Sequence, residues 1–263
     1  MSSESNGKVA IVTGAGSGIG AATALRLAND GYTVVAVDRV DVVHKVADEH
    51  DAIVGCVADI GDEAGNQAMV DAALAAGDGT GLDALVLNAG VAGQGSIADS
   101  PIAELDRMYA VNIRGVVLGV QAALPALRAA KGAVSVTCSV SGLFADPNMW
   151  AYNTTKGAAV NFVRSAAFEL GPGGIRVNGV CPGPIARTGM TTAIEEHREE
   201  LYESMRVHLP LMRWGMADEV AAAHAFLVSD DASFITGVLL PVDGGVTAGT
   251  GQFVPRGLIS PEG

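Results

Sequence analysis

The sequence has 263 residues, of which 49% are hydrophobic and only 17% are charged, and its formal net charge is −13. This composition supplies material for a large core and excludes an intrinsically disordered chain. The acidic balance argues against nucleic acids and anionic membrane surfaces as partners, because both attract a basic protein face.

Cysteine, histidine and apolar runs narrow the class of protein further. Cys56, Cys138 and Cys181 lie in apolar runs without CxxC spacing, so we expect small buried side chains in a reducing compartment. The five histidines show no metal-ligand spacing, so we predict no metal site. The polar N-terminus has no signal-peptide pattern, and the apolar run 115–130 is too short to span a bilayer. We therefore predict a cytoplasmic protein with no membrane partner.

Apolar, β-branched runs alternate with longer helical patterns along the whole chain. Strands are predicted at 8–13, 33–38, 51–58, 82–88, 132–139, 175–181 and 237–243, and helices at roughly 18–30, 40–49, 62–76, 101–130, 151–170 and 216–229. The strand runs are almost continuously apolar, which is typical of strands buried on both faces. The alternation predicts a single α/β domain over 1–263, with a doubly wound parallel sheet of about seven strands between two layers of helices.

The first predicted strand ends in TGAGSGIG (13–20), and a helical pattern follows at once. Glycines allow a tight turn, and the N-terminus of the helix offers free N–H groups that suit a pyrophosphate. The second strand ends in Asp38, where a carboxylate can accept hydrogen bonds from an adenosine ribose. The glycine turn alone could be a simple connection, but together with Asp38 it predicts dinucleotide binding.

The pattern Thr13-Gly14-x-x-x-Gly18-x-Gly20 resembles the TGxxxGxG fingerprint of the short-chain dehydrogenase/reductase family. Further motifs follow in the family's order: LNAG (87–90) for NNAG with Leu87 in place of the first Asn, VNI around Asn112, Ser139, YNTTK (152–156) for YxxxK, CPGPIART (181–188) and ITGVLLPVDGG (235–245). The resemblance covers about residues 8–247. It implies a Rossmann-type fold and an oxidoreductase that uses a nicotinamide cofactor.

Tyr152 and Lys156 are four residues apart, so a helix places them on one face. Ligand sites of doubly wound sheets lie beyond the carboxyl ends of the strands, so we expect the pair at the nicotinamide end of a cleft. A free phenol ionises near pH 10, and acid/base work near neutrality requires roughly 4 kcal/mol in favour of the phenolate. A cation about 4–5 Å away supplies about 3–4 kcal/mol at an effective dielectric near 20. Without the neighbouring motifs, the pair would be an ordinary solvated contact.

The resemblance implies a catalytic set of Asn112, Ser139, Tyr152 and Lys156. In this set Tyr152 exchanges a proton with the substrate hydroxyl, and Ser139 hydrogen-bonds the substrate oxygen. Lys156 also bonds the nicotinamide ribose, and Asn112 holds a water that links the lysine to solvent. Ser141 is a weaker candidate for the role of the serine.

The cofactor is predicted to be NAD, because the carboxylate of Asp38 repels the 2′-phosphate of NADP. Arg39 could clamp a phosphate, but position 17 is serine, so only one cation is at hand. The resemblance implies cofactor contacts at Gly14, Ser17, Gly18, Ile19, Gly20, Asp38, Arg39, Asp59, Ile60, Asn88, Ala89, Gly90, Val111, Tyr152, Lys156, Pro182, Gly183, Ile185 and Thr188. Asp59 is equally well explained as a helix cap or turn residue.

The segment 186–214 is too long for a plain crossover, so we predict a substrate lid that contains an amphipathic helix. We expect Gly93, Ser141, Leu143, Trp150 and Met190 to line a mostly apolar pocket beside it. Few cations are expected near this pocket, and Arg187 is the exception. The predicted substrate is therefore an apolar or cyclic alcohol or ketone, of steroid, terpenoid or acyl type, rather than an acidic metabolite.

Assembly and the end of the chain are open at this stage. The family is usually tetrameric, so we expect a homotetramer, with a dimer as the alternative. The tail 248–263 is rich in glycine and proline and is either disordered or docked over the active site of a neighbouring subunit. The alternative functions are an NADPH-dependent 3-oxoacyl reductase and a non-catalytic protein that senses dinucleotides.

Overall fold

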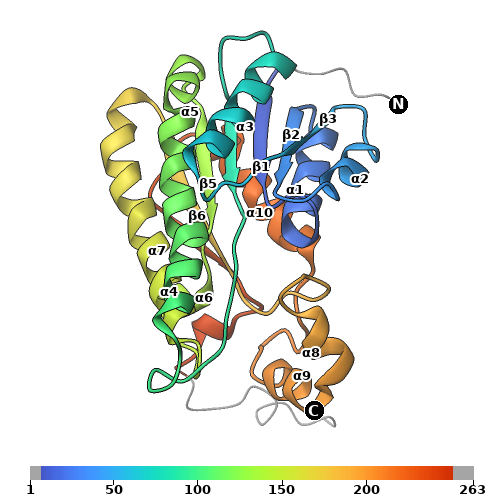
Figure 1. The fold of residues 1–263 in the computed structure, drawn as a ribbon, viewed down its shortest axis with the longest axis vertical. Coiled ribbons are helices and arrows are strands. Elements are labelled where there is room, and N and C mark those ends of the chain that lie inside the picture. The colour runs from blue at the N-terminus through green and yellow to red at the C-terminus, as the bar shows by residue number, and fades with distance from the viewer. Residues whose placement is uncertain (1–6, 251–263) are drawn as a thin grey trace.

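A computed structural model describes residues 7–250 and contains one seven-stranded sheet with all neighbouring strands parallel (Figure 1). The strands are β1 (Val9–Thr13), β2 (Thr33–Asp38), β3 (Ile53–Val57), β4 (Ala84–Leu87), β5 (Ala133–Thr137), β6 (Arg176–Pro182) and β7 (Leu239–Val242). Their order across the sheet is β3-β2-β1-β4-β5-β6-β7. This order reverses between β1 and β4, and the predicted doubly wound α/β fold is confirmed.

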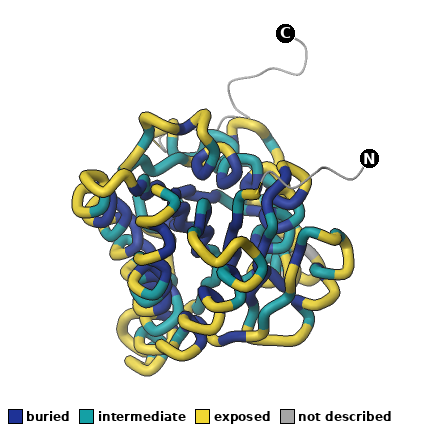
Figure 2. The backbone as a smooth tube through the Cα atoms, turned by 90° about the horizontal axis from the view of Figure 1, so that it is seen from above, coloured by how far each residue is buried: buried dark blue, intermediate teal, exposed yellow. Residues whose placement is uncertain are grey.

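Helices cover both faces of the sheet. One face packs against α1 (Gly18–Asn29), α2 (Val43–Ala47) and α10 (Ala217–Val228), and the other packs against α3 (Glu63–Ala76), α5 (Val116–Ala130) and α7 (Trp150–Leu170). Alternate residues of each strand supply the two cores: Ile11 joins the α5–α7 side, while Ala10 and Val12 join the α1–α10 side. Figure 2 shows the buried residues concentrated in the strands and on the inner sides of the helices. The site residues therefore project from a rigid, doubly covered sheet.

A helical run from Ile102 to Ala130 joins α4 (Ile102–Tyr109), a π-helical turn (Ala110–Gly115) and α5. With 29 residues and a mean hydropathy of 1.4 in its most apolar window, this run is long and apolar enough to cross a membrane. The helix is the one predicted at 101–130, and the apolar run 115–130 is its second part. Half of the window is buried inside the fold, and Val116, Val120 and Leu127 belong to the core. Packing against the sheet accounts for the apolar composition.

Two local predictions were wrong. The helix expected at 40–49 shrinks to α2, because the Asp38 carboxylate accepts a hydrogen bond from Val40 N and forms a local turn there. Cys56 is half-buried rather than buried, unlike Cys138 and Cys181, because its strand β3 forms the edge of the sheet.

The lid segment between β6 and α10 contains two short helices, α8 (Thr192–His197) and α9 (Glu199–Arg206), rather than a single amphipathic helix. Arg198 (φ −139°, ψ 55°) has a non-helical backbone conformation and separates them. Both lie beyond the carboxyl ends of the strands, apart from the layers that cover the sheet (Figure 1). Residues 246–248 form a 3₁₀ turn, and most of the predicted tail, 251–263, lies outside the described residues.

Candidate active site

The turn between β1 and α1 is built so tightly that it requires glycine. Gly14 has φ +65°, and a Cβ on it would lie 2.8 Å from the Cα of Ala89. A Cβ on Gly20 would overlap the carbonyl of Gly14. The turn therefore presses the first helix against the end of β4, which is the approach that a dinucleotide site needs.

The N-terminus of α1 is open to a ligand. Ser17 is the N-cap residue, but its side chain makes no capping hydrogen bond, and the first turn contains no acidic residue. The N–H groups there and the partial positive charge of the helix suit a pyrophosphate. Thr188, from the loop after β6, lies across the turn, since a Cβ on Gly18 would be 3.4 Å from the Cβ of Thr188.

Asp38 ends β2 beside this turn. Its Oδ2 accepts a hydrogen bond from Gly16 N at 3.0 Å, and its Oδ1 accepts one from Val40 N at 3.3 Å. The carboxylate therefore faces the glycine turn at the position where an adenosine ribose is expected. Arg39 is exposed.

Asn88 joins the turn to the middle of the sheet. Its Nδ2 donates to the carbonyls of Thr13 and Gly14 at 3.1 and 3.3 Å, and its Oδ1 accepts from Thr137 Oγ1 at 3.0 Å. The buried Thr13 hydroxyl accepts hydrogen bonds from the N–H groups of Asn88 and Ala89. These contacts fix the backbone of 88–90, where the sequence predicts cofactor contacts.

Asn112 lies in the π-helical turn, a feature that the sequence did not predict. Its Oδ1 accepts from Val91 N at 2.8 Å, while its Nδ2 donates to Val91 O at 2.9 Å and to Thr155 Oγ1 at 3.0 Å. The side chain thus ties the loop after β4 to α7. Gly90 lies between this asparagine and Lys156, since a Cβ on it would be 3.3 Å from Asn112 Oδ1 and 3.5 Å from Lys156 Nζ.

Tyr152 and Lys156 occupy the first turns of α7 and are almost fully buried. Lys156 Nζ lies 5.8 Å from the centre of the Tyr152 ring and donates a 2.8 Å hydrogen bond to the carbonyl of Thr137 at the end of β5. Tyr152 packs with Met108 and Ala151 in a small apolar cluster. The phenol and the ammonium therefore share a largely water-free space next to Gly90.

Ser139 is the N-cap of a short helix, α6 (Val140–Leu143), that follows β5. Its Oγ donates to Ser141 Oγ at 3.1 Å, and Ser141 Oγ donates to Asp146 Oδ2 at 2.5 Å. This helix packs directly on α7, because a Cβ on Gly142 would lie 2.5 Å from the carbonyl of Lys156. The helix that Ser139 caps therefore lies against the helix that carries Tyr152 and Lys156, and Asp146 is a carboxylate near Ser139 that the sequence analysis missed.

Other predicted cofactor residues have structural roles of their own. Asp59 Oδ1 accepts from Gly61 N, which is the turn role already considered for it, and the side chain of Ile60 is buried in the core. Val111 and Ile19 pack against core clusters, and Ile185 is buried. Gly183 passes close to Asp243, and Pro182 ends β6. Their contacts with a cofactor remain predictions.

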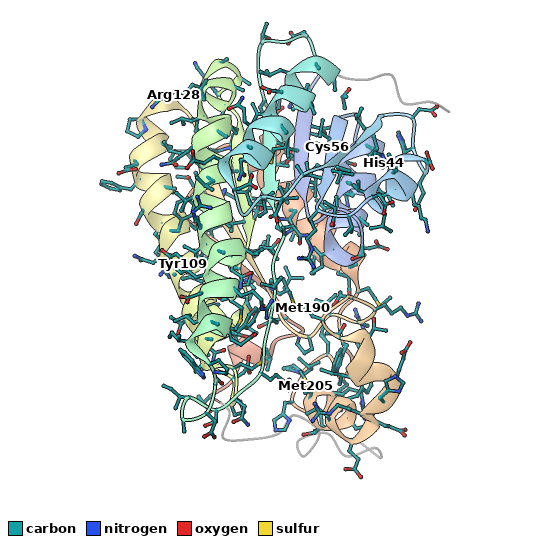
Figure 3. All side chains as sticks on the ribbon, in the orientation of Figure 1. His44, Cys56, Tyr109, Arg128, Met190 and Met205 are labelled. Carbon is teal, nitrogen blue, oxygen red and sulfur yellow. The ribbon has the colours of Figure 1, made fainter. Side chains whose placement is uncertain are left out.

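The predicted pocket residues have different surroundings, and only Trp150 shares the apolar cluster of Tyr152. Trp150 packs in the cluster of Tyr152, Ser141 is buried beneath Ser139, and Leu143 packs against the core. Gly93 faces α4 through Met108. Met190 is 45% exposed and lies in the lid segment before α8, whereas Met205 lies in α9 (Figure 3).

Two surface cavities lie away from these residues. One of about 660 Å³ lies at the amino ends of the strands and is lined by Lys8, Gly132 and Arg176 among others. The other, of about 380 Å³, is lined by Glu196, Glu199, Tyr202 and Glu203 of the lid. No predicted catalytic residue lines either cavity, so the candidate site is located by the side chains gathered at the carboxyl ends of the strands.

Comparisons with known proteins agree with this arrangement. A family model described as enoyl-(acyl carrier protein) reductase matches residues 14–247. The meso-2,3-butanediol dehydrogenase of Serratia marcescens is 38% identical over 248 residues, which are 93% of this chain and 96% of the relative. The cyclohexanol dehydrogenase of Acinetobacter sp. is 38% identical over 254 residues, 94% and 98% of the two chains. A structure of 3-ketoacyl-(acyl-carrier-protein) reductase from Brucella melitensis complexed with NADH has a TM-score of 0.84 at 36% identity, covering 92% of this chain and 98% of that one.

Fold and site together define an oxidoreductase that uses a nicotinamide cofactor. The chain belongs to the short-chain dehydrogenase/reductase family, as its motifs predict. Its relatives are enzymes, so the alternative of a non-catalytic dinucleotide sensor is set aside.

Proposed function

We propose that this enzyme interconverts a secondary alcohol and a ketone with NAD(H), and that Tyr152 is its acid/base group. The observation that carries the proposal is the buried pair of Tyr152 and Lys156 next to Gly90, on a helix against which the short helix capped by Ser139 packs. When bound, the nicotinamide supplies the hydride acceptor or donor. The protein's task is then to bind the cofactor, orient the substrate oxygen and move one proton.

Lys156 supports the proton transfer electrostatically. Its Nζ lies 5.8 Å from the centre of the Tyr152 ring. A positive charge beside the ring stabilises negative charge that develops on the hydroxyl during proton transfer. The carbonyl of Thr137 holds the ammonium in place, and a lysine has three donors, so capacity is left for a ribose hydroxyl.

Ser139 is suited to hold the substrate oxygen. Its hydroxyl proton points toward Ser141, whose own proton points toward the Asp146 carboxylate. Rotation of the Ser139 hydroxyl presents either a lone pair to an alcohol or a proton to a ketone oxygen. The resemblance implies that Asn112 holds a water. Its side-chain amide is already engaged by Val91 and Thr155, so we do not assign that role to the side chain.

NAD is favoured over NADP by the position of Asp38. Its carboxylate is held against Gly16 N at the glycine turn, so a 2′-phosphate there would meet a fixed negative charge. Arg39 is one exposed cation and does not offset this arrangement alone. The structure of the Brucella melitensis 3-ketoacyl-(acyl-carrier-protein) reductase is a complex with NADH, which supports the same choice.

The proposed substrate is an apolar or cyclic alcohol or ketone. The apolar cluster of Met108, Ala151 and Tyr152 and the exposed Met190 support an apolar pocket. Asp146 disfavours anionic substrates, because its carboxylate hydrogen-bonds the serine pair. The names of the butanediol and cyclohexanol dehydrogenases support a small neutral alcohol. A 3-oxoacyl reductase remains the second candidate, since the NADH-bound relative carries that name.

We further propose a cytoplasmic homotetramer, with a dimer as the alternative. The three cysteines are free, which suits a reducing compartment. Phe168 and Phe226 on α7 and α10 are 89% and 41% exposed and offer apolar surface for association. Sedimentation of the purified chain measures the assembly.

A substrate panel tests the function. The purified enzyme is given NAD or NADP with small acyclic diols, cyclohexanol, a hydroxysteroid and a 3-hydroxyacyl thioester, and reduced nicotinamide is followed by absorbance. We expect turnover with NAD and a neutral secondary alcohol. Turnover only with the thioester and NADP would favour the second candidate, and no turnover on any alcohol or ketone would contradict the proposal.

A further inference from the structure

A histidine lies fully buried beneath the candidate site and has no part in the proposed chemistry. His224 belongs to α10, on the face of the sheet opposite α7, and its exposed fraction is 0%. Its ring contacts Ser135 and Thr137, which are alternate residues of β5 and therefore point to the same face. Burial lowers the pKa of His224 to about 3, so the ring is neutral at working pH.

The hydrogen bonds around this ring allow one arrangement of protons. The amide of Asn88 is oriented by its two donations to Thr13 O and Gly14 O, so its Oδ1 faces Thr137. The Thr137 hydroxyl donates its single proton to that oxygen and must accept from His224 Nε2–H at 3.0 Å. Nδ1 then accepts from the Ser135 hydroxyl at 2.7 Å. The chain Ser135 → His224 → Thr137 → Asn88 is therefore directional and fully satisfied.

This chain touches the two parts of the site that need exact placement. At one end, Asn88 holds the carbonyls of Thr13 and Gly14 in the glycine turn. In the middle of the chain, the backbone carbonyl of Thr137 accepts the hydrogen bond from Lys156 Nζ at 2.8 Å. Thr137 therefore connects the cofactor side and the catalytic side, and His224 supplies the only hydrogen bond that it accepts at Oγ1 from a side chain among residues 7–250.

We propose that His224 is a positioning residue that sets Thr137 and Asn88, and through them the glycine turn and Lys156. A buried histidine could instead serve packing alone, and the two roles predict different behaviour. A packing role depends on volume, whereas a positioning role depends on a donor and an acceptor in the places of Nε2 and Nδ1. Glutamine can supply both, while leucine fills space without either. The inference rests on the dinucleotide site proposed above.

The test compares His224→Leu with His224→Gln. NADH affinity is measured by fluorescence. The steady-state constants are measured with the best alcohol of the panel, and folding is checked by the thermal midpoint. We expect His224→Leu to weaken NADH binding about tenfold and to lower kcat, because buried hydrogen-bonding groups lose their partners. His224→Gln should stay within about threefold of the wild-type enzyme, by restoring those partners.

Several results would overturn the inference. One such result is a folded His224→Leu with wild-type NADH affinity and kcat. Another is a folded His224→Gln that is as impaired as the leucine variant. Either would show that His224 serves packing alone. If His224→Leu does not fold, Thr137→Val and Thr137→Ser test the inference instead. Valine keeps the shape of the side chain, and serine keeps its hydroxyl. Wild-type NADH binding in Thr137→Val would also overturn it. Failure of the wild-type enzyme to bind NADH would instead contradict the proposed function.

Discussion

The glycine-turn side of the site and the lid are held together in different ways. On the first side, the buried Thr13 and the half-buried Asn88 and Thr137 exchange hydrogen bonds across three strands. The lid is held by an ion pair between Arg206 and Glu203 and by a stack of Tyr202 on Trp214, with ring centres 4.7 Å apart. Buried polar networks tolerate little change, whereas exposed ion pairs contribute little and vary freely. The difference suggests a fixed cofactor half and a lid in which substrate preference can change.

The largest effect that sharpens this comparison is expected from Gly20→Ala. A Cβ there would overlap the carbonyl of Gly14, so the turn must move and NADH binding should fall by roughly 100-fold or more. Gly189→Ala in the lid region is the matched control, because its Cβ would meet nothing within 4 Å, and its affinity should stay within about twofold. NADH titration measures both. Equal affinities in the two variants would break the comparison.

Asp38→Ala should change cofactor preference without unfolding the protein. Removing the carboxylate beside Gly16 N takes away the repulsion of a 2′-phosphate and leaves Arg39 next to it. The ratio of kcat/KM with NADPH to that with NADH should rise roughly 10- to 100-fold. Asp41→Ala makes the same change of net charge at an exposed neighbour and should leave the ratio unchanged. A ratio that moves equally in both variants would refute a local role for Asp38.

The buried histidine should make stability depend on pH. Since burial lowers the pKa of His224 from 6.5 to about 3, the unfolded chain takes up a proton that the folded chain refuses. Stability is present above pH 6.5 and is lost on acidification, by about 2 kcal/mol between pH 7 and pH 5. The hydrogen bond with Arg213 lowers the pKa of Glu219 from 4.5 to about 2. The effect of Glu219 on stability therefore changes with pH below this window.

Denaturant unfolding at pH 7 and pH 5 checks that dependence. His224→Gln should lose about 2 kcal/mol less than the wild-type protein over this interval. His208→Gln replaces an exposed lid histidine and should keep the wild-type dependence. The same loss in wild-type and His224→Gln proteins would exclude a buried, neutral His224.

The smallest effect is expected in the lid, from Tyr202→Ala. Its ring stacks on the buried Trp214, and the following Gly215 pairs with Pro184 and Ala186 beside Ile185. Losing the stack loosens the lid, so KM for the alcohol should rise by up to about tenfold while NADH affinity stays unchanged. Tyr202→Phe keeps the stack and should behave as the wild type. An unchanged KM in Tyr202→Ala would remove the lid from substrate binding.

The cofactor half could be predicted because its constraints are local in sequence. A glycine turn, an acidic residue at the end of β2 and a pair on one helical turn are visible as spacings. Asn88–Thr137–His224 could not be predicted, because the three residues meet only after strands and a helix distant in sequence pack. A lone histidine in AAAHAFLV carries no periodic signal.

Details of the lid and of the long helix could not be predicted from the sequence. The amphipathic pattern of 186–214 predicts helix, but the sequence does not mark the break at Arg198. The π-helical turn contains Asn112, whose side chain bonds Val91 and Thr155 from other parts of the chain. Tertiary contacts decide such details where local propensity does not.

The most direct test of the central claim is to measure turnover and NADH affinity together in Tyr152→Phe. Phenylalanine keeps the ring and removes the hydroxyl that is proposed to carry the proton. We predict a fall in kcat of roughly 1,000-fold, with NADH affinity within about twofold of the wild type. Wild-type turnover in this variant would show that the proton moves by another route and would contradict the account.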